Sequence, residues 1–121
     1  MSRRNGRDGE GLRVKTPAEV RAILAELRAR LEKIYGDRLR GLYLYGSYAR
    51  GDARVGSDLD VLVVLDQVHS YWEEIKRTSY VRAELSLAHD LTISLTYIGA
   101  DDWHGGQTPF LRGVRHEARA A

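Results

Sequence analysis

The residues of this sequence that could carry chemistry are concentrated in one segment, GSYARGDARVGSDLD, which spans positions 46–60. The segment ends with Asp58 and Asp60, two acids separated by a single residue. Side chains two apart on a strand leave the same face, with their Cα atoms about 6–7 Å apart, so the two carboxylates can share one or two hard cations. Magnesium takes oxygen ligands and typically uses one or two carboxylates together with substrate phosphates. The pair therefore predicts a magnesium site.

The beginning of the segment predicts a site for phosphate groups. Gly46 allows the backbone to approach a triphosphate closely, the start of a helix presents unpaired N–H groups, and Ser47 adds a hydroxyl donor. We expect Arg50 to stabilise the negative charge of the phosphates. Two magnesium ions in front of such a turn would activate an attacking hydroxyl and stabilise a leaving pyrophosphate. The segment thus predicts nucleotidyl transfer, while the sequence has no Walker-type turn and no dinucleotide fingerprint.

A purely structural interpretation of the two acids is the alternative. Asp58 would then cap a turn, and Asp60 would sit at an exposed strand start. The run that follows them, VLVVL, is apolar throughout and predicts a central strand buried on both faces. Charged residues that enter such a strand are costly without a partner or a metal. The metal interpretation is therefore favoured.

The surrounding elements must place these residues. Thr16, Pro17 and Glu19 form the capping box and first position of a helix, and Gly36 is expected to end it. Alternation and apolar runs mark the strands. The predicted order is a helix over 17–34, a strand over 42–45, a turn or very short helix over 46–51, a strand over 58–65, a helix over 71–89 and a strand over 91–98. A loop over 99–107, with a turn at 101–103, and a helix from 108 onward complete the order. This order predicts an α+β fold, with a small mixed sheet and helices packed mainly on one face.

Length and composition predict a single domain over residues 16–121, preceded by a disordered basic tail over residues 1–15. The chain has 121 residues, no cysteine and a formal net charge of +2. The tail holds five cations against two acids, so the rest of the chain is close to neutral and predicts no nucleic-acid-binding surface. No apolar run suggests a secretory signal or a membrane span, so we expect a cytoplasmic protein.

The segment 46–60 resembles the signature of the DNA polymerase beta-type nucleotidyltransferase superfamily, in particular the minimal nucleotidyltransferase (MNT) family. The later segments LSLAHDLTISLTYIGADDW and TPFLRGVRHEA are similar to the strand and terminal helix of small bacterial members. The resemblance implies a nucleotidyltransferase-like mixed sheet and the use of ATP and magnesium. It also implies frequent pairing with a small helical HEPN-type protein, in which the MNT protein is the antitoxin and can adenylylate the toxin.

The same resemblance implies a third carboxylate from a later strand. Asp90 is the only acid near that strand, and by alternation it shares a polar face with Thr92, Ser94 and Thr96. We therefore expect Asp90 to be a metal ligand or base, with a helix-end or turn role as the alternative. Ser94 is the other residue that could occupy the position of the family's acid. If the third carboxylate is missing, the protein is expected to be a weak enzyme or a binding module.

Our leading hypothesis is magnesium-dependent transfer of AMP from ATP to a hydroxyl of a partner protein, because the chain has no second domain with which to enclose a small acceptor. Two alternatives remain open from the sequence. One is a binding module that neutralises its partner by contact alone. The other is transfer to a small molecule such as an aminoglycoside, with a second copy of the chain completing the pocket, so homo- and hetero-oligomers are both considered.

Overall fold

The computed structural model describes residues 13–121 of the chain. Most of the predicted basic tail, residues 1–15, therefore lies outside the described residues. Helix α2 (Pro17–Tyr35) begins with the predicted capping box, in which the Thr16 hydroxyl accepts from the Glu19 N–H and the Glu19 carboxylate accepts from the Thr16 N–H. Gly36 lies at its end, with φ 56°. The sequence signals for this helix are confirmed at both ends.

A four-stranded sheet follows, in the order β3–β2–β1–β4. Strand β1 (Leu39–Tyr45) runs antiparallel to β2 (Leu59–Leu65), and β2 runs parallel to β3 (Ile93–Gly99). The parallel pair is connected by helix α4 (Tyr71–Ala88). A short strand β4 (Arg119–Ala120), which the sequence did not predict, adds to the free edge of β1. The sheet is therefore mixed, as predicted.

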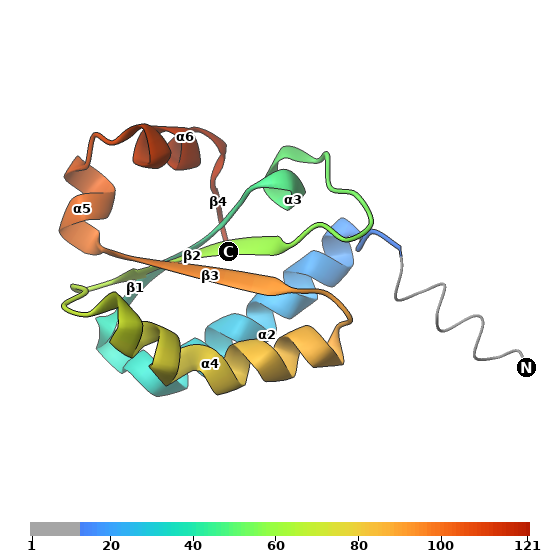
Figure 1. Ribbon diagram of the computed structural model, residues 1–121, viewed down its shortest axis with the longest axis horizontal. Helices are drawn as coiled ribbons and strands as arrows, with labels where there is room; N and C mark the ends of the chain where they lie inside the picture. The colour runs from blue at the N-terminus through green and yellow to red at the C-terminus, as the bar shows by residue number, and fades with distance from the viewer. Residues whose placement is uncertain (1–12) are drawn as a thin grey trace, which may run out of the picture.

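The two long helices, α2 and α4, cover one face of the sheet, as Figure 1 shows. The other face carries two short helices, α5 (Ala100–Gly105) and α6 (Pro109–Glu117). The sequence predicted a loop over 99–107 with only a turn at 101–103, whereas the structure has a helix over Ala100–Gly105, in which Trp103 is buried against the sheet with its ring 4.9 Å from that of Tyr43. This packing supports a helical turn that local sequence propensity does not specify.

Strand β2 is central, and six of its seven residues are buried. Val61 and Val63 belong to the core beneath α2 and α4, whereas Leu62 and Val64 belong to the smaller core beneath α5 and α6. Side chains alternate along a strand, so Asp60 faces the same side as Leu62. The acid at the start of β2 is thus directed toward the α6 side of the sheet, while its neighbours Leu59 and Val61 are fully buried on the other side.

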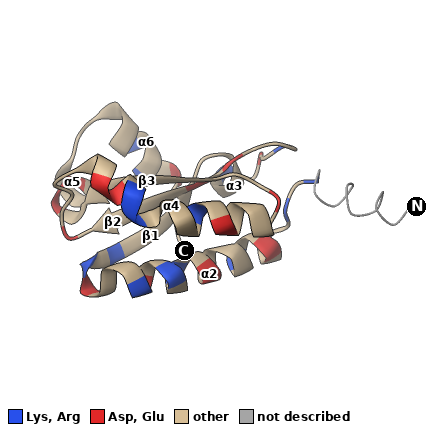
Figure 2. Ribbon diagram, turned by 60° about the horizontal axis from the view of Figure 1, so that its bottom comes forward, with Lys and Arg blue, Asp and Glu red and all other residues tan. Residues whose placement is uncertain are grey.

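Basic and acidic residues are interspersed along α2 and α4, as Figure 2 shows. Several of these residues pair, for example Arg30 with Glu84 between the two helices at 2.5 Å and Arg28 with Glu32 within α2 at 3.7 Å. Such mixed, exposed pairs contribute little stability each. Within residues 13–121, no helix has the length and apolar character needed to cross a membrane.

Candidate active site

The turn after β1 has a backbone geometry that glycine alone adopts readily. Gly46 has φ 78° and ψ −159°, a region that is essentially restricted to glycine. Ser47–Arg50 then form the single helical turn α3, and Gly51 ends it in the left-handed region with φ 86°. The predicted turn or very short helix is confirmed. Two glycines therefore allow the chain to leave β1, make one helical turn and reverse.

Gly46 packs directly against Asp60. A Cβ atom placed on Gly46 would lie 2.2 Å from Asp60 Oδ2 and 3.0 Å from its Cγ. The pairing of β1 with β2 explains this closeness, because Tyr45, the residue before Gly46, is opposite Asp60 in the antiparallel register. This register brings the glycine-serine turn and the second acid into one place. Only a residue without a side chain leaves room for the carboxylate at this point.

The two signature acids differ in their surroundings. Asp60, the second residue of β2, is partly buried, whereas Asp58 is exposed and immediately precedes the strand. Burial raises the pKa of Asp60, the charges of Asp58 and Glu117 raise it further, and Arg50 opposes them. Ionised Asp60 is therefore held in an unfavourable environment, which a bound cation would relieve.

This environment fits a magnesium ion that uses few protein ligands. Within the described part of the chain, no group of three or more His, Asp or Glu side chains is arranged to hold a metal ion. Asp58 and Asp60 would thus supply the protein oxygens, and the remaining positions would go to substrate phosphates and water. Magnesium commonly keeps several waters and binds through one or two carboxylates plus phosphates, so two acids are sufficient.

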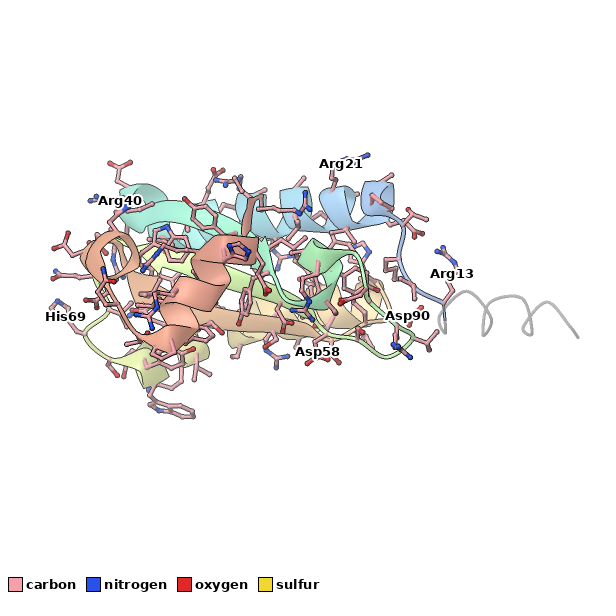
Figure 3. All side chains as sticks on the ribbon, turned by 90° about the horizontal axis from the view of Figure 1, so that it is seen from above. Arg13, Arg21, Arg40, Asp58, His69 and Asp90 are labelled. Atoms are coloured by element: carbon pink, nitrogen blue, oxygen red, sulfur yellow. The ribbon has the colours of Figure 1, made fainter. Side chains whose placement is uncertain are left out.

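Asp90 lies apart from this pair. It occupies the turn between α4 and β3, is exposed and has φ 54°, and its charge is not among those that shift the pKa of Asp60. In Figure 3 both Asp58 and Asp90 lie on the half of the molecule opposite His69, but at separate positions. The residue beside Asp60 on β3 is Ser94, its partner in the parallel register. The structure thus places a hydroxyl, rather than a carboxylate, next to Asp60.

The predicted phosphate donors are partly engaged. Within residues 13–121, the hydroxyl and the backbone N–H of Ser47 have no hydrogen-bond partner and are available to a ligand. Arg50 instead contacts two acids, with Nε 3.3 Å from Asp52 Oδ2 and Nη1 3.2 Å from Glu117 Oε1. These hydrogen bonds raise the pKa of Arg50, with Glu117 the larger contributor, so the guanidinium stays charged beside the turn.

Two residues of the C-terminal segment also contact the turn, and sequence reasoning missed both. Glu117, the last residue of α6, accepts the Gly46 N–H at 2.7 Å through Oε2. Arg119, in β4, donates from Nε to the Ala49 carbonyl at 2.8 Å. No local pattern could have found them, because 71 and 70 positions separate the contacting residues.

Comparison with known proteins identifies the family. A family model described as the nucleotidyltransferase domain matches residues 24–95, more than half of the chain, and this range includes the turn at Gly46 and both signature acids. The chain belongs to this nucleotidyltransferase family. The resemblance seen in the segment 46–60 is thereby confirmed, and the protein is a nucleotidyltransferase.

Curated relatives resemble this nucleotidyltransferase over most of its folded part. The protein adenylyltransferase MntA of Thermococcus cleftensis is 33% identical over 78 residues, which cover 64% of this chain and 77% of that protein. Two solved structures share the fold. One, a toxin–antitoxin with AMP-PNP, has a TM-score of 0.50 at 20% identity and covers 77% of this chain and 68% of the other. The second, a mutant form of the toxin–antitoxin MntA–HpeT, has a TM-score of 0.52 at 17% identity and covers 80% and 70%.

Proposed function

We propose that this nucleotidyltransferase uses magnesium and ATP to transfer AMP to a hydroxyl group of a separate small helical protein of the HEPN type, and that the two proteins form a toxin–antitoxin pair. The observation that supports the proposal is the close packing of Gly46 against the Asp60 carboxylate, since the turn that begins at Gly46 is the proposed binding site for the phosphates. The description of the Thermococcus cleftensis relative as a protein adenylyltransferase supports a protein acceptor. A cytoplasmic location is part of the same proposal.

The proposed reaction is an in-line displacement. The acceptor oxygen forms a bond to the α-phosphorus of ATP, the bond from that phosphorus to the α,β-bridging oxygen breaks, and pyrophosphate leaves with the bonding electrons. The hydroxyl proton passes to a carboxylate of the site and then to solvent. Magnesium, when bound, supplies Lewis-acid stabilisation of the charge that develops on the phosphate oxygens.

Each signature residue has a role in this scheme. Asp58 and Asp60 hold the metal, and Ser47 donates its hydroxyl and N–H to the phosphates, with Gly46 providing the close approach. Arg50 stabilises negative charge at the phosphates. Asp90 remains a proposed ligand or base, and it would have to reach the site from the turn before β3.

The test is label transfer from ATP to the protein encoded by the neighbouring gene. The wild type and the double variant Asp58→Asn/Asp60→Asn are incubated with labelled ATP, magnesium and that protein. A matched control is Asp37→Asn/Asp101→Asn, which removes the same charge from two exposed acids outside the site. We expect transfer by the wild type and the control and none by the signature double variant. Equal transfer by all three proteins would rule out the assignment of Asp58 and Asp60.

A second candidate function is favoured by the hydroxyl of Ser94 next to Asp60, where a third carboxylate would complete the metal site. A protein with only two acids could neutralise its partner by contact alone. A thermal shift with magnesium and ATP distinguishes the candidates, because a ligand that binds the native state raises its stability. Protection of cells by the Asp58→Asn/Asp60→Asn variant, together with no thermal shift of the wild type, would support contact alone.

A further inference from the structure

The C-terminal segment forms hydrogen bonds to both ends of the signature turn, residues 46–50. At the start of the turn, the Gly46 N–H donates to Glu117 Oε2 at 2.7 Å. At its end, Arg119 Nε donates to the carbonyl of Ala49 at 2.8 Å. The pairing of β4 with β1 brings these residues to the turn, because Arg119 is the register partner of Leu44, two residues before the turn begins. We propose that Glu117 and Arg119 act as positioning residues that form a clamp on the nucleotide-binding turn.

The first contact controls the position of Gly46. The α-carbon of Gly46 lies so close to the Asp60 carboxylate that a methyl group would not fit between them. A short hydrogen bond from the Gly46 N–H to a carboxylate is charge-assisted and stronger than one to a neutral acceptor. Glu117 thereby holds the turn against Asp60, so the spacing between the Ser47 donors and the Asp60 carboxylate depends on a residue outside the segment 46–60.

The same carboxylate orients Arg50. Glu117 Oε1 and Oε2 lie 3.2 and 3.4 Å from Arg50 Nη1, so one side chain fixes both the backbone at the start of the turn and the cation at its end. Glu117 is the less exposed partner, with 23% of its side chain accessible against 49% for Arg50. A partly buried partner restricts the guanidinium more than its other contact does, because Asp52 is itself exposed.

The clamp leaves the ligand-facing groups of the turn available. The N–H and hydroxyl of Ser47 have no partner within the described residues, whereas the N–H of Gly46 is used by Glu117. The Gly46 N–H therefore supports the turn, and the Ser47 donors are left for the ligand. Donors that are displaced from the phosphates lose hydrogen bonds to ATP, and the loss of such a hydrogen bond weakens binding roughly tenfold, so a support of this kind affects ATP binding without touching substrate. This inference rests on the proposed function for its kinetic consequence, but its structural part can be measured separately.

The kinetic test compares four variants with the wild type in the label-transfer assay. Glu117→Ala removes the acceptor and the charge, Glu117→Gln keeps an acceptor oxygen, and Arg119→Ala removes the second contact. Glu32→Ala is the matched control, since Glu32 is an exposed acid of α2 that pairs with Arg28. We expect Glu117→Ala to raise the KM for ATP about tenfold, Glu117→Gln to restore most of the loss, and Arg119→Ala to fall between them. The control should match the wild type.

Two kinetic outcomes would overturn the clamp. A KM for ATP within twofold of the wild type in Glu117→Ala would show that the contact does not position the turn. A lower KM would show that Glu117 competes with the phosphates for the Gly46 N–H. If Glu117→Ala does not fold, Arg119→Ala replaces it, and a KM for ATP within twofold of the wild type in that variant overturns the clamp.

Amide hydrogen exchange separates the clamp from the proposed function. The Gly46 amide should exchange at least about tenfold faster in Glu117→Ala than in the wild type, with no comparable change in α2 or α4. An unchanged rate at Gly46 would overturn the clamp whether or not the protein transfers AMP. Faster exchange in a protein whose wild type transfers no label would support the clamp and refute the proposed function.

Discussion

The substitution Gly46→Ala tests how closely the signature turn is packed against Asp60, because it adds a single methyl group at the point of contact. The new Cβ atom would lie 2.2 Å from Asp60 Oδ2, and the residue would have to keep φ 78° and ψ −159°. The backbone conformation costs about 1–3 kcal/mol for a residue other than glycine. Displacement of the Asp60 side chain adds an overpacking cost of about 1–3 kcal/mol. We therefore expect Gly46→Ala to lower the free energy of unfolding by about 2–6 kcal/mol.

Two comparisons separate these contributions. Gly36 also has a positive φ, of 56°, but a Cβ atom there would meet nothing within 4 Å, so Gly36→Ala should carry only the backbone cost of about 1–3 kcal/mol. In an Asp60→Ala background, the two closest atoms of the clash are absent. The cost of Gly46→Ala should then fall by about 1–3 kcal/mol, which a double-mutant cycle measures directly.

The assays are urea denaturation of the metal-free proteins and label transfer at equal folded concentration. Gly46→Ala should lose transfer, because its methyl group displaces Asp60, a proposed metal ligand, while Gly36→Ala should keep it. The reasoning is refuted if Gly46→Ala costs no more than Gly36→Ala and shows no coupling to Asp60→Ala. Full transfer by Gly46→Ala would refute it equally, since the turn would then not be packed against a functional carboxylate.

Two further substitutions test the electrostatics of the fold. Asp60→Asn should stabilise the metal-free protein at neutral pH, because burial and Asp58 raise the pKa of Asp60 and so make its ionised form unfavourable in the folded state. Urea denaturation across a pH series should show this gain in stability disappearing as the pH falls below the ordinary pKa of aspartate, since Asp60 is then protonated in both the folded and the unfolded state. If Asp60→Asn were less stable than the wild type at neutral pH, the expectation would be contradicted. Glu74 is 3% exposed and accepts hydrogen bonds from Tyr35 at 2.6 Å and Arg77 at 3.2 Å. Glu74→Ala should lower the free energy of unfolding by about 2–3 kcal/mol, because the buried Tyr35 hydroxyl loses its partner. The same denaturation assay on Glu73→Ala, an exposed neighbour, should show little change, and equal losses for the two variants would argue against a special role for Glu74.

Local signals in the sequence were sufficient for most of the fold. The capping box at Thr16, the apolar run of β2 and the alternation of β3 each arise from short-range rules, and the structure confirms the elements that they predicted. The helix α5 and the strand β4 were missed. The helix depends on burial of Trp103, and the strand consists of two residues that pair with β1, so both depend on tertiary contacts.

In the candidate site, too, some contacts follow from the local sequence and others depend on tertiary structure. Gly46 and Asp60 are close in the sequence and lie at the paired ends of two adjacent strands, so their proximity followed from the segment itself. Glu117 and Arg119 reach the turn from the other end of the described chain, and only the three-dimensional structure brings them there. The expected place of Asp90 was inferred by alternation, but the strand begins at Ile93, so Asp90 falls on the turn before it.

The antiparallel pairing of β1 with β2 also has a consequence for how the molecule assembles and varies. The turn at Gly46 and the acid at Asp60 are joined by a short connection, and closing a short loop costs little entropy. This hairpin can form before the longer crossover through α4 delivers β3, because contacts close in sequence form faster than distant ones. Insertions in α5 or in the turn before β3 would therefore change the outer surface while leaving the spacing between Gly46 and Asp60 intact.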